Sequence, residues 1–314
     1  MGSIGKMYTD LIIKNWPNTR LGLQTSRTEG DFFLNDKFEF VNSSLDECIK
    51  WRPDAAIICN PAIMHIDFSI RLLEANIPVL IEKPIGVGEE SFDKIYKLKE
   101  LSRNCVALVG YVLRHEPGFK VIKDILLKNK LGKVSEARFL CSSWLPNWRP
   151  DIDYRNSVSA QKKLGGGVLL ELSHELDLAL SLFGSINLSF SQLKNSGILE
   201  IDVEDYALLK GSSEKCEKII FELDFCSKEN KRIVDLSGTK GEAFWDIKNG
   251  LVKAEFINQE EIIYEFKELK SQKYLVQVKH FFDCIENDIK PECKIKDGLL
   301  VIDLINQAKK LSNV

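Results

Sequence analysis

The sequence predicts an α/β fold: a parallel sheet covered by helices on both faces, followed by an α+β domain with a large open, mainly antiparallel sheet. Strand and helix patterns alternate, with short connections, as far as residue 111. After Arg114 the order changes, and several alternating strands follow one long apolar helix. With 314 residues, 44% of them hydrophobic, the chain is long enough for two domains, which we place at residues 1–115 and 116–314.

The first domain contains short apolar runs such as "AAIIC" and "CVALVGY", which are typical of buried parallel strands. The strands expected here are 19–26, 55–59, 78–82 and 105–111, and the helices are 44–51, 64–76 and 89–103. Ser44 is the expected cap of the first of these helices. Ligands of such sheets bind beyond the carboxyl ends of the strands. Those ends are Thr25-Ser26-Arg27, Asn60-Pro61, Glu82-Lys83-Pro84 and Tyr111.

The second domain begins with a helix pattern that stops at Gly132 and a strand at 133–144. One long helix is then predicted to start at Gly165. The later strands are expected at 204–211, 218–226, 231–238, 242–247 and 261–268, and the closing helices at 274–288 and 298–312.

Composition excludes several classes of protein. The net charge is −3 and the pI is near 6.0, with no basic block, so we expect no nucleic-acid partner. The apolar runs fall well short of the roughly 18 residues of a membrane-spanning helix, and no signal peptide is visible. The eight cysteines are scattered, without C-x-x-C or zinc spacing. These features predict a cytoplasmic protein without a structural metal.

The N-terminus "MGSIGKMYTDLIIKN" places Gly2-Ser3-Ile4-Gly5 directly before an apolar-periodic helix. This is the second half of G-x-G-x-x-G, the turn that cradles a dinucleotide pyrophosphate, and it requires a preceding strand. We therefore expect roughly ten residues, a first strand and a first glycine, to be missing upstream. The strands near "GLQTS" and "AAIIC" should then flank a gap.

Two segments carry candidate chemistry. Lys83 ends a buried strand and is held by the next proline, so it suits donation to a substrate oxygen; the alternative is a lysine that extends to solvent. In "GGGVLLELSHELDLAL", Glu171, His174 and Asp177 are three residues apart, which suits a general base with a carboxylate partner. A solvated polar stripe and a His/Glu/Asp metal site are the alternatives.

Taken together, these segments resemble the glucose–fructose oxidoreductase/inositol dehydrogenase family (Gfo/Idh/MocA). The matching segments are "GSIGK", "IICNPAIMH", "VLIEKPIG", "GYVLRHEP", "LGGGVLLELSHELDLALSLFG", "GTKGEAFWD" and "KDGLLVIDLINQAKKLS". The resemblance covers nearly the whole chain, and it implies a Rossmann-type first domain. One departure concerns the catalytic helix. The family usually has Asp-x-x-x-His, whereas this chain has Glu171-x-x-His174 and keeps the His-x-x-Asp step to Asp177, so either acid could partner His174.

The resemblance also assigns residues to roles. It implies Lys83 and His174 as catalytic residues, with Glu171 or Asp177 orienting His174. The substrate would meet Arg114, Tyr154, Arg155 and His174, although Arg155 is equally consistent with a plain surface arginine. The cofactor would meet Gly2, Ser3, Ile4, Gly5, Ser26, Arg27, Asn60, Pro61, His65, Glu82 and Lys83.

The implied function is an NAD(P)-dependent oxidoreductase acting on a hydroxyl or keto carbon of a sugar or nucleotide sugar. The segment "YRNSVSA" resembles members tied to bacterial surface sugars. Ser26 and Arg27, with no acidic residue beside them, favour NADP over NAD. The open sheet favours a homo-oligomer. The alternatives are a truncated, non-catalytic sugar- or nucleotide-binding homologue, and a lyase or epimerase that retains its cofactor.

Overall fold

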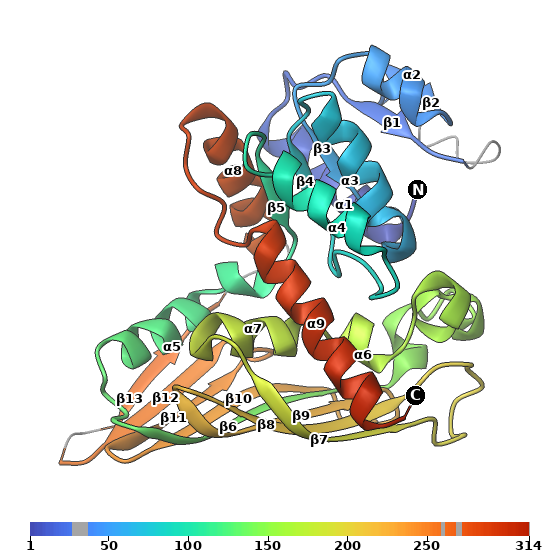
Figure 1. Cartoon of the computed structure of the whole chain (residues 1–314). Coiled ribbons are helices and arrows are strands. Elements are labelled where there is room, and N and C mark those ends of the chain that lie inside the picture. The colour runs from blue at the N-terminus through green and yellow to red at the C-terminus, as the bar shows by residue number, and fades with distance from the viewer. Residues whose placement is uncertain (27–36, 259–260, 268–271, 314) are drawn as a thin grey trace.

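Two parallel sheets and one large mixed sheet form the two halves of the molecule, and α9 runs between the halves (Figure 1). The structure is a computed structural model that describes residues 1–26, 37–258, 261–267 and 272–313. Among these residues, no helix is long and apolar enough to cross a bilayer.

The helices begin and end close to where the apolar spacing predicts. Their bounds are α1 Ser3–Asn15, α2 Leu45–Lys50, α3 His65–Glu74, α4 Phe92–Leu101, α5 Pro117–Leu127, α6 Val168–Glu171, α7 His174–Phe183, α8 Gln272–Glu286 and α9 Ile295–Leu311. Short 3-10 turns connect them: η1 Ala62–Met64, η2 Val112–His115, η3 Leu145–Trp148, η4 Tyr154–Asn156, η5 Val158–Ala160 and η6 Lys162–Leu164.

The strands of the first half are short and those of the second half are longer. Their bounds are β1 Gly22–Gln24, β2 Phe40–Asn42, β3 Ala56–Ile58, β4 Val79–Ile81, β5 Ala107–Val109, β6 Val134–Ser142, β7 Asn187–Lys194, β8 Tyr206–Ser213, β9 Cys216–Asp224, β10 Lys231–Gly238, β11 Gly241–Asp246, β12 Leu251–Phe256 and β13 Ile262–Glu265.

The parallel sheet β3–β4–β5 is covered on both faces, as its continuous apolar strands predict. Alternate residues point to opposite faces. Leu80 and Leu108 pack with α1 and α8, whereas Val79 and Ile81 belong to the core that contains α3 and α4. Because the three strands run parallel, their carboxyl ends lie at one edge of the sheet, where the candidate residues lie.

Strands β1 and β2 form a separate parallel pair. Among the described residues, no backbone ladder joins β1 to β3. The sequence predicts a gap between these two strands, and the sheet is divided at that place.

The large sheet has the strand order β13-β12-β11-β10-β6-β9-β8-β7, and all neighbours are antiparallel except β6 and β9. The helices α5, α6, α7 and α9 lie on one side of it (Figure 1). Three strands are absent from the sequence-based prediction: β2, β7 and β12. Exposed polar residues dominate β7 at the sheet edge, so its apolar alternation is weak.

Two helix predictions are wrong in their bounds. The helix α5 ends at Leu127 rather than at Gly132, and Asn129 follows with a φ of 52°. The long helix expected from Gly165 is divided into α6 and α7. Ser44 does precede α2, but its side chain makes no capping hydrogen bond.

At the glycine run before α6, the backbone comes close to neighbouring segments. A Cβ on Gly166 would lie 2.4 Å from the Val158 carbonyl oxygen, and one on Gly167 would lie 2.4 Å from Glu204 Oε1. Gly167 also has a φ of 110°. The run therefore fixes where α6 begins.

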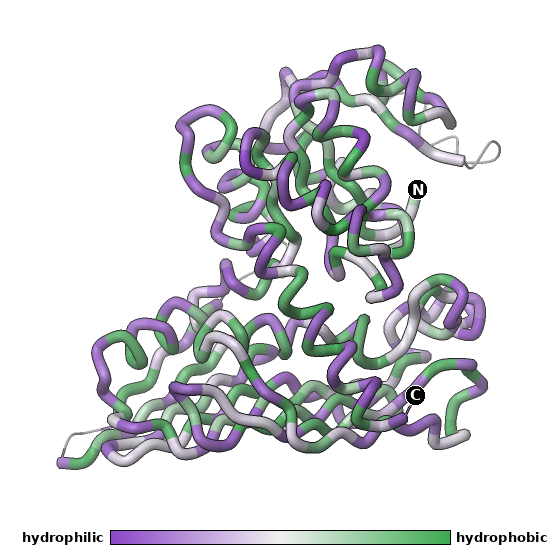
Figure 2. The backbone as a smooth tube through the Cα atoms, viewed as in Figure 1, coloured by the Kyte–Doolittle hydropathy of each residue, from purple (hydrophilic) through white to green (hydrophobic). Residues whose placement is uncertain are grey.

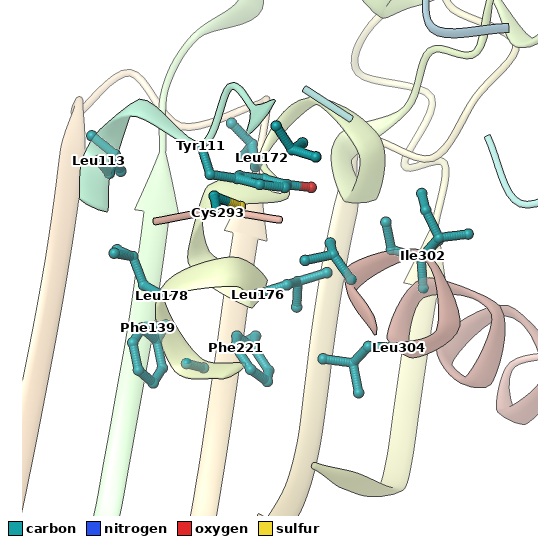
Figure 3. Packing of buried hydrophobic residues seen from close by; sticks show 14 of the residues in the cluster. Tyr111, Leu113, Phe139, Leu172, Leu176, Leu178, Phe221, Cys293, Ile302 and Leu304 are labelled. Atoms are coloured by element: carbon teal, nitrogen blue, oxygen red, sulfur yellow. The ribbon is translucent and has the colours of Figure 1, made fainter. Parts of the chain in front are cut away.

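The core between the halves is assembled around α7. Leu176 and Leu178 of α7 lie between Tyr111 and the large sheet (Figure 3). On the sheet side, Phe139 and Phe221 stack with ring centroids 5.4 Å apart. Hydrophobic and hydrophilic residues alternate along the strands of the large sheet, so its helix-covered face belongs to this core (Figure 2).

The last helices of the chain return to the first half. Tyr274 and Phe282 of α8 make edge-to-face contacts with Tyr8 of α1 and with Trp16 directly after α1, at centroid distances of 5.8 and 5.0 Å. The division at residues 115 and 116 stays a prediction, because α8 packs against the sheet of the first half.

Candidate active site

The carboxyl edge of β3–β4–β5 meets the break between α6 and α7. Lys83, just after β4, donates from Nζ to the Glu171 carbonyl oxygen at 3.0 Å. Tyr111, just after β5, donates from its hydroxyl to Ser173 Oγ at 3.4 Å. The structure thus brings the Glu-Lys-Pro segment and the Gly-Gly-Gly segment together, although they are far apart in the sequence.

Lys83 is directed into the protein rather than out to solvent. Its side chain is 17% exposed, and its Nζ lies 3.8 Å from Glu171 Oε2. The Lys83–Pro84 peptide bond is cis. An ammonium group held at a helix end in this way can donate to an oxygen atom placed beside it.

His174 is the first residue of α7 and is buried, with 8% exposure. Its Nδ1 has no hydrogen-bond partner among the described residues, and its ring lies edge-on to Tyr111 at 5.6 Å. Burial lowers the pKa of His174 well below its usual value, and the nearby charges of Arg232, Lys83 and Lys273 lower this pKa further. The imidazole is therefore neutral at neutral pH and can accept a proton.

Neither candidate acid makes a described hydrogen bond to His174, so the orienting role of Glu171 or Asp177 stays a prediction. The residues Leu172 and Ser173 interrupt the helix, so Glu171 and His174 do not share one continuous helical face. Glu171 interacts with Lys83 instead.

Asp177 is bound by Arg114 rather than by His174. Arg114 Nε and Nη2 donate to the two carboxylate oxygens at 2.9 and 2.6 Å, and Nη1 donates to the Glu292 carbonyl oxygen at 2.9 Å. Burial raises the pKa of Asp177 to about 6, although Arg114 acts in the opposite direction. The guanidinium group of Arg114 is thus taken up inside the protein, and the expected substrate contact of Arg114 stays a prediction.

The turns after β3 and β4 are connected by His65. Its Nδ1 lies 2.7 Å from the Pro84 carbonyl oxygen, and its Nε2 lies 2.8 Å from the Asn60 carbonyl oxygen. His65 was expected to contact the cofactor, but both ring nitrogens contact the protein. Next to it, the buried Asn60 Oδ1 has no partner among the described residues and can accept a hydrogen bond from a ligand.

The Gly2–Gly5 turn lies beside the end of β3. Gly2 precedes α1 without a side-chain cap, so the first amides of the helix remain available to an anion. A Cβ on Gly5 would lie 3.8 Å from Cys59 Cβ, an ordinary contact distance, so Gly5 lies next to the residue that follows β3. Together with the unpartnered Asn60 oxygen, this turn fits a dinucleotide along the edge. Ser26 is exposed after β1, and Arg27 lies outside the described residues.

The loop before the glycine run holds Tyr154 and Arg155. Arg155 is half exposed and pairs with Asp153 and Glu200, each at 2.9 Å. The Tyr154 hydroxyl accepts a hydrogen bond from the Glu200 backbone at 3.2 Å. The structure neither contradicts nor tests the expected substrate contacts of these two residues.

Sequence reasoning missed two ion pairs that surround His174. Arg232 pairs with Glu175 at 2.6 Å, and Lys273 pairs with Glu116 at 2.6 Å. Arg232 could have been found from the sequence, because it is a charged residue in phase with the buried Val234 along an alternating strand. Lys273 could not. Within the described ranges, no group of three or more His, Cys, Asp or Glu side chains is arranged to hold a metal ion.

Two family descriptions match this chain. The model described as the oxidoreductase family NAD-binding Rossmann fold matches residues 24–111, and the one described as the oxidoreductase family C-terminal alpha/beta domain matches residues 123–313. The chain belongs to the Gfo/Idh/MocA family of oxidoreductases. The resemblance noted from sequence is thereby confirmed, together with the fold class and an NAD-binding Rossmann domain.

Relatives in this family act on sugars and related polyols according to their names. Myo-inositol 2-dehydrogenase of Thermotoga maritima is 22% identical over 82% of this chain and 77% of its own length. A dTDP-3,4-didehydro-2,6-dideoxy-alpha-D-glucose 3-reductase of Actinomadura kijaniata is 26% identical over 44% of this chain. Several curated matches, that reductase among them, span less than half of the relative's length, 39% in its case.

The solved structures confirm the fold. A levoglucosan dehydrogenase in complex with NADH and levoglucosan superimposes with a TM-score of 0.85, covering 99% of this chain and 95% of the other at 16% identity. At this identity, the Gfo/Idh/MocA chain shares the arrangement of elements with the dehydrogenase.

The buried pair of Arg114 and Asp177 yields a stability prediction. Arg114→Met should lower the free energy of unfolding by about 3–5 kcal/mol at neutral pH, because it leaves an unpaired buried carboxylate. The loss should shrink as the pH falls and Asp177 becomes protonated and neutral. Denaturant unfolding at pH 8 and pH 5 measures both effects.

The matched control is Arg155→Met, which removes an exposed arginine that also pairs with two acids. That change should cost less than about 1 kcal/mol at either pH. Equal losses of unfolding free energy in the two variants would show that the buried Arg114–Asp177 pair contributes no more to stability than an exposed pair.

Proposed function

We propose that the chain is an NAD(P)-dependent oxidoreductase that acts on a hydroxyl or keto carbon of a sugar or nucleotide sugar. The observation that carries this proposal is the buried, neutral His174 beside Lys83 at the carboxyl edge of the parallel sheet. A proton acceptor and a hydrogen-bond donor to the same oxygen are what alcohol oxidation requires of a protein. The family names of the relatives support the substrate class.

The residues divide the work as follows. His174 takes the hydroxyl proton during oxidation and returns it during reduction. Lys83 donates to the same oxygen and stabilises the charge that develops there. Glu171 holds Lys83 through its carbonyl oxygen, which limits the positions of the ammonium group. The nicotinamide, when bound, accepts or donates the hydride.

The cofactor end of the proposal uses the Gly2–Gly5 turn and Asn60. The α1 amides suit the pyrophosphate, and the free Asn60 oxygen suits an amide donor such as the carboxamide of the cofactor. Tyr154 and Arg155 are proposed on the substrate side, where Arg155 suits a carboxylate or phosphate of a nucleotide sugar. We propose a role in surface-polysaccharide biosynthesis from the sequence resemblance alone. We propose a cytoplasmic location from the scattered cysteines.

The catalytic prediction concerns two substitutions. Lys83→Met and His174→Gln should each lower turnover by about 10²-fold or more, because each removes a group that acts on the reacting oxygen. Reduction of NAD⁺ and NADP⁺ should be followed with myo-inositol, levoglucosan and dTDP- and UDP-linked hexoses as a substrate panel.

Lys94→Met is the matched control, since it removes a half-exposed lysine that pairs with the half-exposed Asp67 and has no proposed role in the reaction. It should keep full turnover. Normal activity in Lys83→Met or His174→Gln would remove that residue from the mechanism. Cofactor binding without turnover on any member of the panel would favour the non-catalytic alternative.

The cofactor preference is a separate prediction. We propose NADP rather than NAD, because Ser26 and Arg27 follow β1 with no acidic residue to accept the ribose hydroxyl. Arg27→Ala should weaken NADPH binding by about 10-fold and leave NADH binding unchanged. Fluorescence titration of both cofactors measures this, and a preference for NADH in the unaltered chain would defeat it.

We also propose a homo-oligomer formed through the open face of the large sheet. In-register residues cross this face from strand to strand and combine apolar with charged side chains: Phe190, Lys210, Ile220, Arg138, Asp235, Phe244, Lys253 and Ile263. The described helices of this half lie on the other face (Figure 1). Such a mixed surface suits association with a second copy.

Phe244→Glu should dissociate this assembly, because it places a charge in the middle of the proposed interface. Light scattering after size-exclusion chromatography reports the mass. Phe92→Glu, on an exposed residue of the other half, should leave the mass unchanged. A monomeric unaltered chain would contradict the proposal directly.

A further inference from the structure

A chain of buried hydrogen bonds, which the proposed reaction does not use, ends at the backbone nitrogen of Lys83. Gln277 Nε2 of α8 donates to the Tyr8 hydroxyl at 2.7 Å. The Tyr8 hydroxyl of α1 donates to Glu82 Oε1 at 2.5 Å. The other carboxylate oxygen, Glu82 Oε2, accepts from the Lys83 backbone nitrogen at 3.2 Å. We call Gln277, Tyr8 and Glu82 the polar relay.

The direction of each bond follows from the groups themselves. The Tyr8 hydroxyl has one hydrogen, which it gives to Glu82, so it accepts from the amide of Gln277. Both Glu82 oxygens act as acceptors, which is the arrangement of a carboxylate. The relay is therefore ordered from the amide, through the phenol, to an anion next to the Lys83 peptide.

The relay lies in an otherwise apolar environment. Tyr8 belongs to the cluster in which α1 and α8 pack on Leu80 and Leu108, and Gln277 is fully buried. Gln277 Oε1 has no partner among the described residues. Buried polar groups that are not all satisfied cost stability, so packing alone gives no reason for this one.

The groups around Glu82 act on its pKa in opposite directions. Burial raises the pKa of Glu82, whereas the Tyr8 hydrogen bond and the charge of Lys83 lower it. The other titratable groups that face Glu82 are Cys59 after β3 and Tyr274 of α8, and burial raises the pKa of both, so they are uncharged. Tyr8 and Lys83 are therefore the groups that favour the carboxylate.

The relay also connects the two ends of the proposed cofactor site. Tyr8 lies one turn after Gly5 on α1, whose first amides suit the pyrophosphate. Glu82 lies at the end of β4, and a Cβ on Gly110 at the end of β5 would be 3.2 Å from Glu82 Oε1. The hydrogen bond between Tyr8 and Glu82 thus joins the helix to the end of β4.

We propose that Tyr8 and Gln277 are positioning residues for the nicotinamide end of the cofactor site, which they set by holding the Glu82–Lys83 peptide in place through the Glu82 carboxylate. The inference rests on the proposed function, because it takes Lys83 to lie along the nicotinamide. Neither Tyr8 nor Gln277 touches the reacting atoms; both act through Glu82.

The test compares two ligands and two tyrosines. NADH has the nicotinamide half, whereas ADP-ribose lacks the nicotinamide but keeps the pyrophosphate. Tyr8→Phe should weaken NADH binding about 5- to 10-fold, as the loss of one hydrogen bond to a charged group implies, and should change ADP-ribose binding less than 2-fold. The loss for NADH should be larger at pH 6 than at pH 8, because Glu82 without Tyr8 takes up a proton more readily.

Tyr274→Phe is the matched control, since Tyr274 stacks edge-on to Tyr8 and its hydroxyl makes no described hydrogen bond to Glu82. It should leave both affinities unchanged. Gln277→Leu keeps the Tyr8–Glu82 bond but removes the donor to Tyr8, so its loss should be smaller than that of Tyr8→Phe and again confined to NADH. It also serves as the test if Tyr8→Phe does not fold.

The outcomes separate the two ideas. Equal losses for NADH and ADP-ribose, or no loss for either, would overturn the positioning role and leave the proposed function intact. An unaltered chain that binds neither NADH nor NADPH would overturn the proposed function and this inference with it. Melting temperatures of all variants, measured without ligand, show whether a general loss of stability accounts for the changes.

Discussion

The ion pair between Arg114 and Asp177 is the constraint on which the candidate site depends. Arg114 lies on η2, directly after the parallel sheet, and Asp177 lies on α7 above the large sheet. Three donors of one guanidinium group are used in this contact, two on the carboxylate and one on the Glu292 carbonyl. Because the group is rigid and planar, it fixes the angle between the elements that it joins.

The position of His174 follows from that contact. Asp177 is held one turn along α7 from His174, so the first turn of the helix is fixed relative to the end of β5. On the other side, the glycine run fixes α6, and Lys83 binds the last carbonyl of α6. The positions of Lys83 and His174 are therefore set by the two halves together.

The fold could be predicted from sequence because its signals are local. The continuous apolar runs of β3, β4 and β5 and the spacing of α3 and α4 are readable without knowledge of neighbours. The edge strand β7 could not be predicted, because its pattern depends on a partner strand and on α9. The parallel pair of β6 and β9 is likewise a matter of topology.

The sequence names candidate site residues, whose roles stay predictions, but it does not predict the bonds that these residues make. Lys83 and His174 were found because strand ends and histidines beside acids are visible in sequence. The pairing of Asp177 with Arg114 could not be predicted, since the two residues lie 63 positions apart. The break between α6 and α7 is also not visible in the sequence. Local spacing predicts which side chains face one another only while the helix is continuous.

The electrostatics of the site follow from the same arrangement. The acids nearest to His174 in the chain are already engaged: Glu175 by Arg232, Asp177 by Arg114 and Glu171 by Lys83. The charged neighbours that remain for His174 are cations. Burial and charge therefore both lower the pKa of its ring. A neutral imidazole is thus a consequence of where the carboxylates are used. Burial and the three neighbouring cations therefore both disfavour the protonated ring of His174.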